Sequence, residues 1–112
     1  MIRHPAIRDR ARVVELNDRL RTTFAGGHVQ LHTGGHCLDA QLCGRALYAL
    51  SRYSHFAPDD EHDFGEFRFA GFQFGWQIEY RNVDGVGWSR DPADADGTLR
   101  VLTLYVVSDT LT

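Results

Sequence analysis

A Phe-rich segment, residues 64–81, constrains the fold of this chain more than any other part of the sequence. It reads FGEFRFAGFQFGWQIEYR, and large apolar residues alternate with polar ones in both of its halves. Alternation with a period of two is the pattern of a half-buried β-strand, and the small Ala-Gly pair between the halves is typical of a turn. Pairing the halves about this turn places Phe69 opposite Phe72 and Phe67 opposite Phe74. We therefore predict a β-hairpin with one aromatic face and one polar face.

Four further segments have regular patterns. Apolar residues recur at helical spacing in residues 5–24 and 38–53, whereas residues 28–33 alternate as a strand does. Residues 98–107 are apolar on both sides, as expected of a central strand or of one whose second face is covered. The first helix is predicted to bury one apolar stripe: Ala6, Val13, Leu16, Leu20 and Phe24. The order helix, strand, helix and three strands predicts a single α+β domain over residues 1–112, with two helices on one face of a four-stranded, mostly antiparallel sheet.

Charge is unevenly distributed along the chain. Residues 1–56 hold eight arginines and four acids, whereas residues 57–112 hold four arginines and eleven acids. The acids cluster in the segments APDDEHDFGEF (57–67) and DPADADG (91–97), between expected elements. The predicted partner-binding residues are Asp59, Asp60, Glu61, His62, Asp63, Glu66, Asp91, Asp94 and Asp96. An acidic surface of this kind would dock on an Arg-rich or basic surface of a protein partner.

The first acidic segment has two other interpretations. Asp and Pro are ordinary turn residues, so the segment could be a solvated loop. It could also be a general acid–base or divalent-metal site, in which His62 acts with Glu61 or Asp63 and is joined by Asp91 and Asp94. Catalysis needs these side chains to converge in a pocket, but neighbouring residues of an extended loop diverge. We therefore predict binding rather than catalysis and assign no catalytic residue.

No other motif indicates a metal or a cofactor. His28, His32 and His36 are spaced by four residues, but in a strand such residues are about 13 Å apart, too far to share one zinc ion. His36 and Cys37 lack a second pair of ligands. The arginines of the first helix are interleaved with acids, so nucleic acid is not the expected partner. No apolar run is long enough to cross a bilayer and the N-terminus does not resemble a secretion signal, so we expect a cytoplasmic protein without a membrane partner.

Several short motifs together resemble a known family. They are LNDRLR (16–21), EHDFG (61–65), WQIEY (76–80), DPAD (91–94) and TLRVLT (98–103). This combination resembles the bacterial family known as domain of unknown function 3768, over nearly the whole chain from about Leu16. The C-terminal VVSDTLT differs from the acidic-aromatic ending of that family. The resemblance implies a small bacterial intracellular protein of a type met on plasmids, prophages and other mobile elements, and it implies no activity.

Three classes of function remain open. We predict a non-enzymatic protein that acts by protein–protein binding, and a narrower hypothesis makes it an acidic inhibitor of a host defence nuclease complex, as an anti-CRISPR protein is. The first alternative is a hydrolase or metal-dependent enzyme that uses the Glu61-His62-Asp63 cluster. The second is a homodimeric structural or nucleic-acid-associated module. A dimer is motivated by an uncovered face of the last strand, formed by Val101, Tyr105 and Val107.

Overall fold

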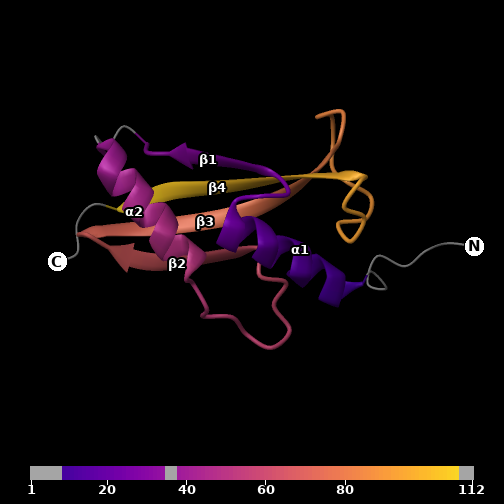
Figure 1. Ribbon diagram of the computed structural model, residues 1–112, viewed down its shortest axis with the longest axis horizontal. Coiled ribbons are helices and arrows are strands. Elements are labelled where there is room, and N and C mark those ends of the chain that lie inside the picture. The colour runs from indigo at the N-terminus through magenta and orange to yellow at the C-terminus, as the bar shows by residue number, and fades with distance from the viewer. Residues whose placement is uncertain (1–8, 35–37, 109–112) are drawn as a thin grey trace, which may run out of the picture.

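The computed structural model describes residues 9–34 and 38–108 of the 112-residue chain. In chain order, the elements are α1 (Arg10–Thr23), β1 (His28–His32), α2 (Ala40–Ser51), β2 (Phe64–Phe69), β3 (Phe72–Asn82) and β4 (Thr98–Ser108). Both helices lie on the same face of the sheet (Figure 1). The predicted α+β fold and its order of elements are therefore confirmed.

The four strands form one mixed sheet in the order β1-β4-β3-β2. β3 is antiparallel to both β2 and β4, whereas β1 is parallel to β4, with His28 opposite Val101 and His32 opposite Tyr105. Of the two arrangements expected for the last strand, the structure has the central one, because β4 lies between β1 and β3.

The β2–β3 hairpin has the predicted register. Phe67 is paired with Phe74, and Phe69 with Phe72. The two residues between Phe69 and Phe72 have positive φ angles of 54° and 86°. Positive φ at both central positions is the geometry of the two-residue turns that match the twist of a β-hairpin. The alternation of the sequence and the local turn geometry thus select the same pairing.

Both helices begin at an aspartate cap. The Asp9 side chain accepts a hydrogen bond from the Arg12 backbone N–H at 3.1 Å, and Asp39 accepts one from the Leu42 N–H at 2.7 Å. Each cap satisfies an amide that the first turn of a helix leaves unpaired. α1 therefore begins later than the start at Pro5 that the periodicity predicted; Pro5 itself lies outside the described residues.

The core lies between the helices and the sheet. Its buried apolar residues are Leu20, Ala46, Leu50, Phe74, Trp76, Ile78, Leu102 and Leu104. Burying a side chain as large as Trp76 or Phe74 stabilises the fold by about 2–3 kcal/mol each. The predicted α1 stripe is partly wrong, because Phe24 adopts a left-handed cap conformation and is 38% exposed. Two polar residues, Asn17 and Arg21, are buried on this helix instead.

The opposite face of the sheet is covered by no helix of the described residues (Figure 1). Phe64 is 63% exposed and Val107 is 48% exposed, as an open face predicts. Tyr105 lies across Gly75 of β3, where an added Cβ atom would come within 2.5 Å of the Tyr105 ring. Glycine at this position therefore makes room for the tyrosine ring on the open face.

Candidate functional site

The loop that follows α2 is anchored by aromatic packing. The Phe56 ring stacks on the His62 ring with centroids 3.7 Å apart, and it contacts Trp76 edge-on at 6.2 Å. The Arg21 guanidinium lies 4.9 Å from the Phe56 centroid and 5.9 Å from that of Trp76, as in a cation–π interaction. We call residues 57–63 the 57–63 loop. This packing holds the loop against α1 and the core.

The three residues Glu61, His62 and Asp63 bind different parts of the molecule. The backbone carbonyl of Glu61 accepts a hydrogen bond from Asn17 at 3.0 Å, and the Asp63 carboxylate accepts one from the Tyr80 hydroxyl at 2.8 Å. These contacts attach Glu61 to α1 and Asp63 to β3. The side chains of His62 and Asp63 contact different residues, Asp18 on α1 and Tyr80 on β3.

His62 has its own carboxylate partner, which sequence reasoning missed. Its Nδ1 atom lies 2.9 Å from Asp18 Oδ1, and the same oxygen accepts a hydrogen bond from Arg21 at 2.7 Å. The backbone of His62 has a positive φ of 59°, and its N–H is donated to Asp60 at 3.0 Å. Positive φ at a non-glycine residue costs energy, so the tight turn depends on these contacts. Asp18 lies 44 residues away in the sequence, which hides the pair from local patterns.

A buried pair of polar residues, Asn17 and Arg100, joins the two acidic segments. Asn17 is fully buried and Arg100 is 1% exposed. Arg100 Nε donates to Asn17 Oδ1 at 2.9 Å, and Arg100 Nη2 donates to the backbone carbonyl of Pro92. Asn17 Nδ2 donates to the Glu61 carbonyl at 3.0 Å. Asn17 therefore holds the 57–63 loop, and Arg100 holds the loop of residues 83–97, the 83–97 loop. The hydrogen bond between these two side chains links the two loops.

Tyr80 completes the network. Its hydroxyl accepts a hydrogen bond from Asn17 at 2.8 Å and donates one to Asp63. The pKa of the Tyr80 phenol is raised well above its ordinary value of 10.0, mainly by burial. The hydrogen bond from Asn17 lowers this pKa, whereas the charges of Asp63 and Glu61 raise it further. At neutral pH the phenol is protonated and holds the Asp63 carboxylate in place.

The predicted partner-binding residues fall into three groups. Four carboxylates are exposed on the two loops: Asp59, Asp91, Asp94 and Asp96. Four residues are half-buried: Asp60, Glu61, His62 and Asp63. Glu66 is separate from both groups, because it lies on the open face of β2, where it accepts a hydrogen bond from Gln73 at 3.1 Å. We name the carboxylates of the two loops the acidic rim: Asp59, Asp60, Glu61, Asp63, Asp91, Asp94 and Asp96.

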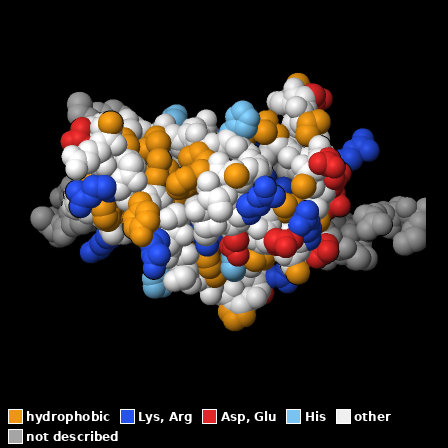
Figure 2. Space-filling view, viewed as in Figure 1, with side chains coloured by type: hydrophobic (Ala, Val, Ile, Leu, Met, Phe, Trp, Pro, Cys, Tyr) orange, Lys and Arg blue, Asp and Glu red, His pale blue; other side chains and the backbone are white. Residues whose placement is uncertain are grey.

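Figure 2 shows how charge is arranged on the face that carries the helices. Acidic side chains gather around α1 and the 83–97 loop, and arginines are interleaved with them. The part of this face that lies over α2 shows mainly apolar and basic side chains. The uneven charge of the sequence therefore appears as an uneven surface.

Two further findings bear on the class of protein. Among the described residues, no three His, Cys, Asp or Glu side chains come together as metal ligands; His36 and Cys37 lie outside that part of the chain. None of the helices in residues 9–34 and 38–108 is long and apolar enough to span a membrane.

The fold and the network define a small α+β protein in which two acidic loops are tied to one helix and one strand. The chain belongs to the family described as "Protein of unknown function (DUF3768)", whose model matches residues 33–109, more than half of the chain. This range includes α2, the strands β2 to β4 and both loops of the acidic rim, whereas α1, with the LNDRLR motif, precedes it. No curated protein matches the chain, and no solved structure matches it.

Proposed function

We propose that this protein acts by binding a protein partner, with the acidic rim as its docking surface and a basic, Arg-rich surface as its target. The observation that supports the proposal is the shared tether. Arg100 and Asn17 hold the 83–97 loop at Pro92 and the 57–63 loop at Glu61. Loops that are already fixed lose less conformational entropy when a partner binds.

Electrostatics supports the same target. Complementary charge steers association and makes it sensitive to salt. Arginines of α1 and the 83–97 loop lie among the acids (Figure 2), so such a partner has to present some acidic groups between its basic ones. A mixed pattern of this kind favours one partner over basic proteins in general.

The narrower proposal concerns the identity of the partner. A protein groove that binds nucleic acid carries arginines that meet phosphates, and carboxylates on tethered loops can pair with such arginines instead. The protein would then inhibit a nucleic-acid-binding complex, such as a host defence nuclease, in the manner of an anti-CRISPR protein carried by a bacterial mobile element. A cytoplasmic location fits this role, and the free thiol of Cys43 is compatible with a reducing compartment.

The test neutralises two rim carboxylates that the fold does not use. Asp59 and Asp96 are exposed, and neither side chain forms a hydrogen bond within the described residues. The double variant Asp59→Asn, Asp96→Asn should therefore fold as the wild type does. A partner captured from a bacterial lysate is purified, and its dissociation constant is measured by calorimetry at several salt concentrations. We expect the double variant to bind about tenfold more weakly at low salt.

The matched control removes two carboxylates from a different surface. Glu66 and Glu79 belong to the sheet face turned away from the helices. The double variant Glu66→Gln, Glu79→Gln removes two negative charges, as the rim variant does. The control should bind as the wild type does. Equal weakening in both double variants would show a general charge effect, and no weakening in the rim variant would refute the proposed surface.

A homodimer is the second candidate, and the open face of the sheet favours it. Phe64 and Val107 are exposed on that face, where Tyr105 lies across Gly75. Val101 contributes little, because it is only 7% exposed between the neighbouring strands. Light scattering at several protein concentrations tests the dimer, and Val107→Glu should dissociate it if this face is the interface.

A further inference from the structure

A surface hollow of about 470 Å³ lies where α2 crosses the tip of β2. α2 and the tip of β2, which line it, lie toward the end of the molecule opposite the 83–97 loop (Figure 1). Its lining residues are Ala40, Gln41, Gly44, Arg45, Tyr48, Ala49 and Phe69. The volume falls within the range of known small-molecule sites, about 300–1,000 Å³. The acidic rim contributes no residue to this hollow, so the inference is independent of the proposed function.

Gly44 lines the hollow but contributes no side chain to it. It lies in the interior of α2, where glycine destabilises a helix relative to alanine. A Cβ atom added to Gly44 would have no heavy atom within 4 Å, and its φ is not positive. Neither close packing nor backbone conformation therefore requires glycine here. The bare helix surface has no explanation in the stability of the fold.

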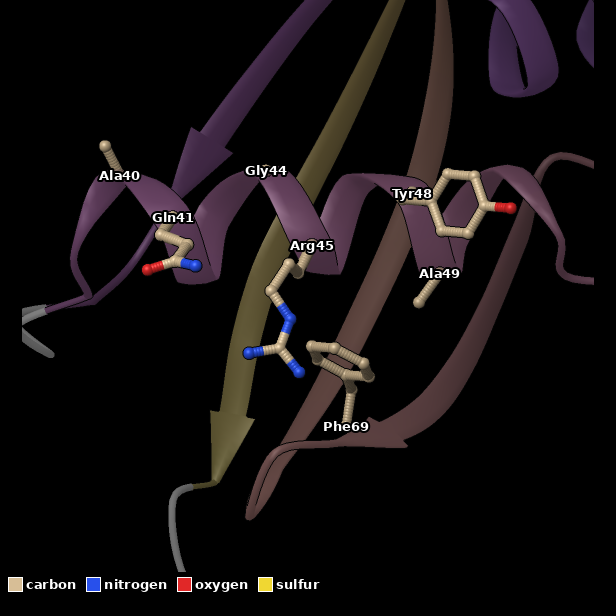
Figure 3. A pocket seen from close by; sticks show the side chains of 7 residues that line it. All are labelled: Ala40, Gln41, Gly44, Arg45, Tyr48, Ala49 and Phe69. Atoms are coloured by element: carbon tan, nitrogen blue, oxygen red, sulfur yellow. The ribbon is translucent and has the colours of Figure 1, made fainter.

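Arg45 supplies the positive charge of the site. Figure 3 shows its side chain extending from α2 toward the ring of Phe69, with Ala49 on the same side of the helix. The guanidinium carbon lies 5.4 Å from the Phe69 centroid. Within the described part of the chain, Arg45 forms no ion pair, and no acid lines the hollow. Its guanidinium is therefore available to an anion from solution.

We propose that this hollow binds a small amphipathic carboxylate, a molecule with one carboxylate and an aromatic or aliphatic body. The carboxylate would pair with Arg45, whose planar guanidinium forms two parallel hydrogen bonds with such a group. The apolar body would lie on Gly44 between Tyr48 and Phe69. A phosphate ester fits less well, because one cation among mainly apolar walls matches a single negative charge.

The test uses 4-phenylbutyrate and its neutral analogue 4-phenylbutyramide as probes on the full chain. Amide signals in nitrogen–proton NMR spectra are followed during each titration. We expect saturable shifts at Gly44, Arg45 and Phe69 with the carboxylate. The neutral amide should bind about tenfold more weakly, because it lacks the charged hydrogen bonds. Shifts that do not saturate, or equal affinity for both probes, would overturn the proposal.

Three variants locate the site. Arg45→Gln should weaken binding of 4-phenylbutyrate about tenfold, whereas Arg52→Gln, an exposed arginine beyond the end of α2, should leave it unchanged. Gly44→Ala should raise the urea midpoint of unfolding and still weaken binding, because its methyl group fills the floor of the hollow. Wild-type affinity in Arg45→Gln or in Gly44→Ala would refute the assignment, and equal loss in Arg52→Gln would refute the role of Arg45.

Discussion

Replacing Asn17 with alanine tests the polar network most directly. Asn17 makes three hydrogen bonds while fully buried: it donates to Glu61 and Tyr80 and accepts from Arg100. Each lost neutral hydrogen bond costs about 1 kcal/mol, and a buried guanidinium N–H left without its acceptor costs about 1.5–3 kcal/mol. The expected loss is about 3–5 kcal/mol, a large part of the stability of about 5–15 kcal/mol that is typical of a single domain.

The assay is urea unfolding followed by tryptophan fluorescence. Trp76 is fully buried whereas Trp88 is 66% exposed, so the change in signal reports mainly on Trp76. Asn17→Asp keeps an acceptor for Arg100 and should lose less stability than Asn17→Ala. Glu15→Ala breaks only an exposed ion pair with Arg12 and should cost about 0.5 kcal/mol or less.

Loss of the Asn17 hydrogen bonds should also loosen particular loops. Asn17 and Arg100 hold both loops, so hydrogen exchange should accelerate in residues 57–63 and 83–97 together in Asn17→Ala. A loss below about 1 kcal/mol would mean that the network adds little to stability. Acceleration in only one loop would refute the shared tether.

Three further variants test other features. Gly75→Ala should cost about 1–3 kcal/mol in urea unfolding, because the added methyl group meets the Tyr105 ring at 2.5 Å, and Tyr105→Ala in the same chain should recover most of the loss. In the wild type, the free energy of unfolding should fall as pH rises above 10.0, because Tyr80 releases its proton there in the unfolded chain, while burial keeps the folded phenol protonated. Tyr80→Phe should flatten this dependence in unfolding curves measured from pH 9 to 11. An unchanged slope in Tyr80→Phe would contradict this assignment. Gly44→Ala should raise the free energy of unfolding by about 0.5–1 kcal/mol, and a lower value would show an unrecognised constraint at that position.

The parts of the fold that sequence predicted are those governed by local periodicity. The pairing of Phe67 with Phe74 follows from alternation, since directly opposed residues share a face. The central position of β4 is one of the two arrangements that apolar residues on both faces allow. The parallel pairing of β1 with β4 could not be predicted, because the partners are about 70 residues apart and no local pattern fixes strand order.

Local periodicity did not predict the buried polar residues. An apolar stripe does not include Asn17 and Arg21, because both are polar. Asn17 nevertheless lies four residues after the buried Val13, and Arg21 four residues after Asn17, on the same face of the helix. Their position on this face was the available signal. The hydrogen-bond partners of Asn17 include Tyr80 and Arg100, which lie 63 and 83 residues further along the chain, so no local pattern reveals them. Arg21 instead donates to Asp18 on the same helix.

The central place of β4 has a consequence for synthesis of the protein. β1 and β3 are both hydrogen-bonded to Thr98–Ser108, and among the described strands they share no other neighbour. On the ribosome, the sheet cannot close until this segment has left the exit tunnel. Until then the aromatic side of the β2–β3 hairpin lacks part of its packing. Exposed hydrophobic surface of this kind binds chaperones or aggregates. Pauses in translation before residue 98 should therefore lower the yield of folded protein more than pauses early in the chain.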